Sequence, residues 1–113
     1  MNMRVAVIRA ASHVVPFIHP VASDVMAPTY RSGQNSLICL PVDAYVCEGV
    51  CLVDGEPYRC ERIGRNVRVW RDNPAHTGYN VDVDLFNSSP LALVVADITV
   101  RNAIGRDIMQ VAA

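Results

Sequence analysis

The chain contains four thiols, which could bind a metal or form disulfides: Cys39, Cys47, Cys51 and Cys60. If Asp54-Gly55 forms a two-residue hairpin turn, Gly49 lies opposite Cys60, and alternation places Cys47 and Cys51 on that same face. No pair of cysteines has the two-residue separation of a zinc knuckle, and diagonal cross-strand neighbours suit a disulfide less well than opposed residues. We therefore expect the four cysteines to act as small buried apolar side chains, and we expect no cofactor. The alternatives are that the cysteines bind a metal or form a disulfide.

The histidines and acidic residues offer only weak catalytic candidates. His76 follows Asp72 in a loop and could form an acid–base pair with it, whereas His13 and His19 lie near proline residues. No nucleophile elbow or comparable local motif accompanies them. Asp82 and Asp84 share one face of a predicted strand and could hold calcium, although an exposed strand face explains them equally well. We predict no catalytic residues and no metal site, so the chain is not expected to be an enzyme.

Charge argues against nucleic acid and membrane partners. Every basic residue is arginine, yet the net charge is −1, whereas nonspecific nucleic-acid binding needs a strong basic field. Five arginines recur at every third position between Arg59 and Arg71, but Gly64 and alternating valines predict a hairpin that scatters them over both faces. No signal peptide or membrane-spanning run is recognisable, which predicts synthesis in the cytoplasm.

Valine and isoleucine dominate the apolar composition, with 18 valines and seven isoleucines against six leucines. Such β-branched side chains favour strands over helices. We predict a single all-β domain, residues 1–113: an antiparallel sandwich or jelly-roll-like barrel of about eight strands. The predicted strands are Met3–Ala10, Ser36–Leu40, Ala44–Val53, Glu56–Ile63, Asn66–Arg71, Asn80–Phe86, Leu91–Arg101 and Ile104–Val111, the last of which could instead be a short helix.

Residues 12–35 differ from the rest of the chain. This segment carries three prolines, Pro16, Pro20 and Pro28, and two formal charges. Proline at this density interrupts regular strand pairing, which predicts an extended arm. Five apolar residues of the arm are the predicted contacts with another subunit: Val14, Val15, Phe17, Ile18 and Val21.

Composition favours assembly as the function. Hydrophobic residues make up 51% of the chain and charged residues 19%, which is more apolar than a small isolated domain requires. We expect a non-enzymatic, self-assembling structural protein that binds copies of itself and a second structural protein such as a capsid shell. Its most concrete form is a small virion component, such as a phage capsid decoration (cement) protein. The alternatives are a small β-barrel or cupin-like ligand-binding protein or enzyme, and a cytoplasmic protein-binding module.

Overall fold

A computed structural model describes residues 15–99 of the chain. Val14 and the predicted strands Met3–Ala10 and Ile104–Val111 lie outside the described residues. The described chain forms strands β1 (Phe17–Pro20), β2 (Asn35–Val42), β3 (Gly49–Val53), β4 (Glu56–Ile63), β5 (Asn66–Trp70), β6 (Tyr79–Asp82) and β7 (Leu91–Thr99), and one short helix, α2 (Val83–Asn87). The predicted all-β character is confirmed.

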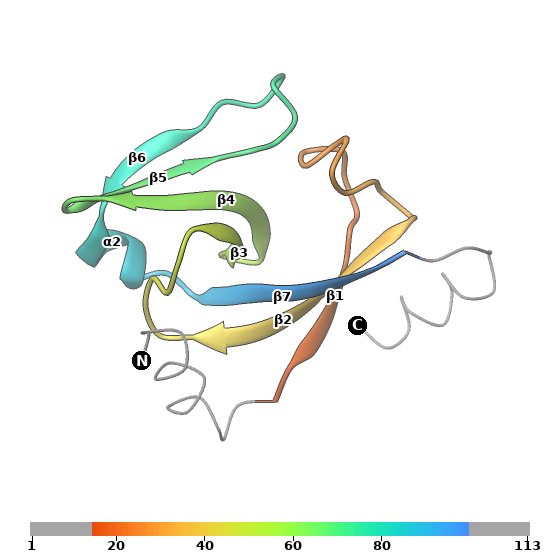
Figure 1. Ribbon diagram of the computed structural model, residues 1–113, viewed down its shortest axis with the longest axis horizontal. Coiled ribbons are helices and arrows are strands. Elements are labelled where there is room, and N and C mark those ends of the chain that lie inside the picture. Colours follow the sequence, from red (N-terminus) through yellow and green to blue (C-terminus); the bar gives the residue numbers. More distant parts are fainter. Residues whose placement is uncertain (1–14, 100–113) are drawn as a thin grey trace.

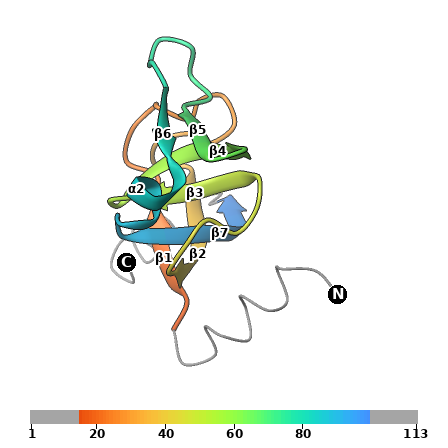
Figure 2. The same ribbon diagram turned by 90° about the vertical axis from the view of Figure 1, so that its left-hand side faces the viewer.

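The seven strands form one antiparallel sheet in the order β1-β2-β7-β3-β4-β5-β6. Strand β7 pairs with both β2 and β3, so the last described strand lies between two strands that follow each other in sequence (Figure 1). The sheet is strongly bent, and the view along its side shows β4, β3 and β7 stacked above one another (Figure 2). It remains open, because β1 and β6 are edge strands. The sandwich or jelly-roll arrangement stays a prediction.

Apolar side chains cover both faces of the sheet where β3 and β7 meet. The first core comprises Val53, Cys60, Val67, Val69, Val83, Phe86 and Leu91. The second core comprises Val21, Leu37, Cys39, Leu52 and Ala92. Adjacent residues of one strand, such as Leu52 and Val53, belong to different cores because successive side chains point to opposite faces.

Strand β7 is buried at its start and exposed at its end. The continuously apolar stretch beginning at Leu91 predicts a strand covered on both faces. Leu91 and Ala92 are buried as this predicts, but Val95 and Ala96 are exposed. The prediction is therefore wrong for the second half of the strand, where neither core lies against the sheet.

The predicted strand Asn80–Phe86 is wrong after Asp82, where helix α2 begins. The Asp82 carboxylate accepts a hydrogen bond from the Asp84 backbone N–H at 2.8 Å, which caps the helix. Val83 and Phe86, three residues apart, both reach the first core from one side of this helix. The cap and this burial outweigh the alternating pattern of the sequence.

The predicted extended arm, residues 12–35, folds against its own sheet over most of its described length. Strand β1 lies within it and pairs with β2. Residues 21–34 then form compact turns that return to β2, closed by bonds of 3.0 Å from Val21 N–H to Asn35 O and 3.1 Å from Gly33 N–H to Val21 O. Met26, in these turns, is fully buried. The described part of the predicted arm is therefore an edge strand followed by a packed connection.

Candidate interaction surface

Strand β1 and the two residues before it carry the exposed part of the predicted interface. The side chain of Val15 is 78% exposed and that of Phe17 is 39% exposed, whereas Ile18 is half-buried. Val21 belongs to the second core of its own chain, so burial within the monomer accounts for it and it is no longer proposed as a contact. Three of the predicted contacts, Val15, Phe17 and Ile18, thus remain on the surface at one edge of the sheet.

An apolar row continues from β1 across β2 and β7; we call it the apolar strip, and it comprises Ile18, Ile38, Leu40, Leu93 and Val95. Ile18 pairs with Ile38, and Leu40 pairs with Leu93. Val95 is the extra residue of a β-bulge in β7 and is 52% exposed. Among the described residues, the members of the strip belong to neither core, and all remain at least partly exposed.

Sequence reasoning identified Ile18 but missed the other four members of the strip. Their signal was present, since Ile38 and Leu40 alternate within one predicted strand. What was missing was the non-local pairing of β2 with β7, which places Leu40 beside Leu93.

The opposite face of the same strands holds an apolar groove of about 320 Å³. Phe17 and His19 of β1 form one wall, and Pro41 of β2, Pro90 and Ala92 contribute to the rest of the lining. His19 is half-buried, and burial lowers its pKa although nearby Glu56 acts in the opposite direction. Burial therefore favours the neutral imidazole, which suits an apolar surface.

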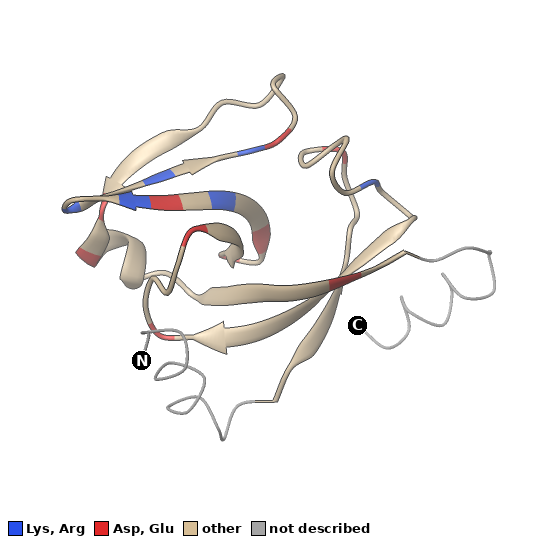
Figure 3. Cartoon of the chain, in the orientation of Figure 1, with Lys and Arg blue, Asp and Glu red and all other residues tan. Residues whose placement is uncertain are grey.

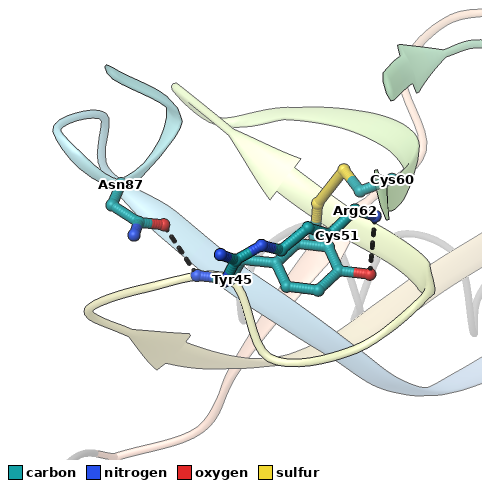
Figure 4. Close-up of a disulfide and its surroundings, with 5 residues drawn as sticks. All are labelled: Tyr45, Cys51, Cys60, Arg62 and Asn87. Atoms are coloured by element: carbon teal, nitrogen blue, oxygen red, sulfur yellow. Dashed lines mark hydrogen bonds between the residues drawn. A yellow bond between two sulfur atoms is a disulfide. The ribbon is translucent and has the colours of Figure 1, made fainter. Parts of the chain in front are cut away.

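The predicted cysteine hairpin is confirmed in its register. Asp54 and Gly55 both have positive φ, as a two-residue turn requires, and Gly49 lies opposite Cys60. Cys51 and Cys60 form a disulfide between β3 and β4 (Figure 4). The expectation of unbridged thiols is thus wrong for these two residues. Their Cα atoms lie 6.8 Å apart, which is at the upper end of the usual disulfide range but still within it, so this pair can be bridged.

The other two cysteines are not part of this bridge. Cys39 is a fully buried member of the second core, and burial raises its pKa to about 11, so it stays a protonated thiol. This confirms the predicted small apolar side chain at that position. Cys47 is half-buried and lines a small cavity together with Cys51. In residues 15–99, no cluster of histidine, cysteine or acidic side chains has the arrangement of a metal site.

Tyr45 connects the disulfide hairpin to helix α2. Its backbone N–H donates to Asn87 Oδ1 at 2.8 Å, and its hydroxyl oxygen accepts from the backbone N–H of Arg62 at 3.0 Å (Figure 4). Its ring also packs edge-on against Phe86. These contacts hold the connection between β2 and β3 over the first core, which is a structural role.

The candidate pair of His76 and Asp72 is not formed. His76 Nε2 instead lies 3.7 Å from a carboxylate oxygen of Asp24. The Asp72 carboxylate accepts two hydrogen bonds from Arg59, at 2.8 and 3.0 Å, and one from the Thr29 hydroxyl. Asp72 thereby links the end of β5 to β4 and to the packed connection 21–34, and none of its contacts prepares a proton transfer to His76.

We predict that this network makes stability depend on pH. Burial raises the pKa of Asp72, but the hydrogen bonds and charge of Arg59 and the Thr29 hydroxyl outweigh it and hold that pKa below its ordinary value. A lowered folded-state pKa contributes stability above the unfolded value of about 3.9, and this contribution is lost as the pH falls through the folded value. Asp72→Asn should therefore lower the free energy of unfolding at pH 7 by about 1–2 kcal/mol.

Urea denaturation at pH 7 and at about pH 3 measures this effect, because the difference between wild type and Asp72→Asn should shrink in acid. Asp43→Asn, which alters an exposed carboxylate, is the matched control. An equal difference at both pH values would show that the charge of Asp72 does not stabilise the fold.

The arginines between Arg59 and Arg71 lie along β4 and β5 and in the turn and loop next to them (Figure 3). The register of β4 and β5 places Arg59 and Arg68 on one face and Arg62 on the other. Four of the five contact acidic or aromatic side chains: Arg59 with Asp72, Arg65 with Asp82 and Asp84, Arg68 with Trp70, and Arg71 with Glu56 and Tyr58. They do not form a continuous basic stripe.

Contacts with Arg65 explain the positions of Asp82 and Asp84 more simply than a calcium site does. Both carboxylates are exposed and contact the guanidinium of Arg65, Asp84 at 2.9 Å and Asp82 at 3.4 Å. Since β6 ends at Asp82, the two residues do not share a strand face as predicted. Their contacts are those of a helix start held to the β4–β5 turn.

Comparison with known proteins gives no assignment. No protein-family model, curated protein or solved structure matches this chain. Over the described part of the chain, no helix has the length and apolar character needed to cross a bilayer. The chemistry and geometry of the surface are therefore the basis for inferring function.

Proposed function

We propose that the protein is a non-enzymatic structural protein that assembles with copies of itself through β1 and the apolar strip. The observation that carries this proposal is the exposure of apolar side chains on both faces of one edge of the sheet: Val15 and Phe17, and the strip that begins at Ile18. We further propose that the assembly is a virion component, such as a phage capsid decoration (cement) protein, with a capsid shell protein as its second partner.

The character of the strip supports a contact formed by apolar burial. Its five members are all aliphatic and come from three adjacent strands. Burying one such side chain contributes about 1.5–3 kcal/mol, whereas association costs at least roughly 4 kcal/mol. Several members of the strip must therefore be covered together, which requires a broad, flat partner surface rather than a single anchoring residue.

Strand addition at β1 is a weaker route to assembly. The strand has four residues, ends at Pro20 and follows Pro16. Proline has no N–H to donate, and short proline-flanked edges resist pairing with another strand. Side-chain packing over the strip is thus favoured over a continued hydrogen-bonded sheet.

The proposal is tested by the native mass of the purified full-length protein, measured by light scattering and native mass spectrometry. Wild type should be oligomeric. Val95→Asp and Ile18→Asp should each shift the mass toward the monomer by weakening association at least about tenfold, because each places a charge in the apolar contact. Circular dichroism checks that each variant is folded, and Val95→Asp is the safer variant because its side chain is already exposed.

Ile63→Asp and Leu85→Asp are matched controls, because these side chains are 61% and 63% exposed but lie on β4 and α2, away from the strip. They should leave the mass unchanged. A wild-type protein that stays monomeric as its concentration is raised would overturn the proposal.

The groove supports a second candidate, a small ligand-binding β protein. Its volume of about 320 Å³ lies at the lower end of the range of about 300–1,000 Å³ that is typical of ligand pockets. A small molecule retained in native mass spectrometry of a monomeric protein would support this candidate over assembly.

A further inference from the structure

The apolar groove beside β1 has a lining that is suited to protein contact. Phe17, Pro41, Leu52, Pro90 and Ala92 give it an apolar lining, and burial lowers the pKa of His19, which favours its neutral form. The floor is rigid, since Leu52 and Ala92 belong to the second core. Such a surface is complementary to aliphatic side chains presented in a row.

The groove is bordered by a net negative charge. Gly55 contributes to the lining, and its neighbours Asp54 and Glu56 both have exposed side chains. Glu56 acts electrostatically on His19, and it also forms an ion pair with Arg71 at 3.0 Å. Two carboxylates and one guanidinium leave one negative charge unbalanced at this border, and the lining itself contains no arginine. An apolar segment that ends in a basic residue would match both features.

The chain carries a segment of this chemistry. Fourteen residues precede Val15, which lies two positions before Phe17 in the groove wall. Within them, the predicted strand Met3–Ala10 would place Met3, Val5 and Val7 on one face, followed on that face by Arg9. We propose that the groove of one copy binds the segment Met3–Ala10 of a neighbouring copy. This inference rests on the self-assembly proposed above.

The segment Met3–Ala10 is expected to enter the groove of a second copy because of where it is attached to its own chain. Phe17 is part of the groove wall, and Ala11–Pro16 joins it to the segment. A return into the same groove would require the chain to reverse within these six residues, with φ of Pro16 fixed. Exchange between copies needs no reversal, and it uses one surface and one segment of every subunit to build a repeating contact.

Isotope-resolved photo-cross-linking of the full-length protein tests the proposal. A photoreactive phenylalanine analogue replaces Val7, and ¹⁴N-labelled and ¹⁵N-labelled proteins are mixed before irradiation. Mass spectrometry should find cross-links from the segment to peptides that contain Pro41 or Pro90–Ala92, with both isotopes in one cross-linked product. Contacts between copies give mixed-isotope and single-isotope products together. If subunits that have been allowed to exchange give no mixed-isotope product, the segment lies in its own groove and the proposal is overturned; cross-links that avoid the groove would overturn it as well.

Charge and lining variants sharpen the test. Arg9→Glu and Pro41→Glu should each lower the yield of groove cross-links by about tenfold, because one reverses the charge that faces the acidic border and the other puts a charge in the apolar lining. Arg31→Glu, at an exposed arginine outside the groove lining, is the matched control and should leave the yield unchanged. If the native mass shows an oligomer but the cross-links miss the groove, this inference fails and the proposed function stands. A monomeric protein contradicts both.

Discussion

Replacing Phe86 with alanine is expected to lower the free energy of unfolding by about 3–5 kcal/mol. The Phe86 side chain is 3% exposed and fills the first core from helix α2. Its ring lies 6.1 Å from that of Tyr45 in an edge-to-face arrangement, so the substitution also removes a contact that holds the connection before β3. Helix α2 has five residues and is too short to be stable alone, so packing of this ring maintains it.

Urea denaturation followed by circular dichroism measures this loss. Leu85→Ala is the matched control, because Leu85 precedes Phe86 in the same helix but is 63% exposed. It should change the free energy of unfolding by about 0.5 kcal/mol or less. Equal losses in the two variants would show that the helix does not cover the core as described.

The second large effect is expected at Met26, whose replacement by alanine should lower the free energy of unfolding by about 2–5 kcal/mol. Met26 is fully buried in the connection between β1 and β2, although the sequence pattern placed it in an extended arm. Its carbonyl oxygen accepts from Tyr30 N–H at 3.1 Å, and Asn73 N–H donates to the neighbouring Val25 carbonyl at 3.0 Å. A cavity at Met26 would therefore loosen both the connection and the loop after β5.

Gln34→Ala is the control for Met26→Ala, since Gln34 lies in the same connection with an exposed side chain. Thermal unfolding should separate the two variants clearly, with the control within about 0.5 kcal/mol of wild type. A Met26→Ala protein as stable as wild type would mean that residues 21–34 are not part of the folded body and would restore the extended arm.

Comparing Met26→Ala with Val95→Asp separates the stability of the monomer from its assembly. Because Met26 and Val21 are buried within one chain, the described connection has little apolar surface left for a neighbour. The apolar surface that we propose for the contact lies instead at Val15 and Phe17 and along the apolar strip. We therefore expect Met26→Ala to reduce monomer stability while the Val95→Asp variant reduces association, so the two properties can be separated experimentally.

Local chemistry along the chain was sufficient to predict much of the fold. The abundance of valine and isoleucine predicts strands, and Asp54-Gly55 predicts the turn, because few residue pairs readily adopt positive φ at both positions. Once that turn is placed, antiparallel pairing requires Gly49 to face Cys60, as observed. These features depend on residues close together in sequence, which is why they could be derived without a structure.

Features that depend on distant residues could not be derived in this way. The alternation Val81-Asp82-Val83 fits a strand, and only the cap at Asp82 and the core that receives Phe86 favour a helix. Likewise, the prolines of residues 12–35 favour an extended arm, and only the burial of Met26 in the folded protein shows that part of this segment packs against the sheet. Burial of a side chain depends on which segments meet it in space, and β7 meets β2 and β3 across large sequence separations that no local pattern encodes.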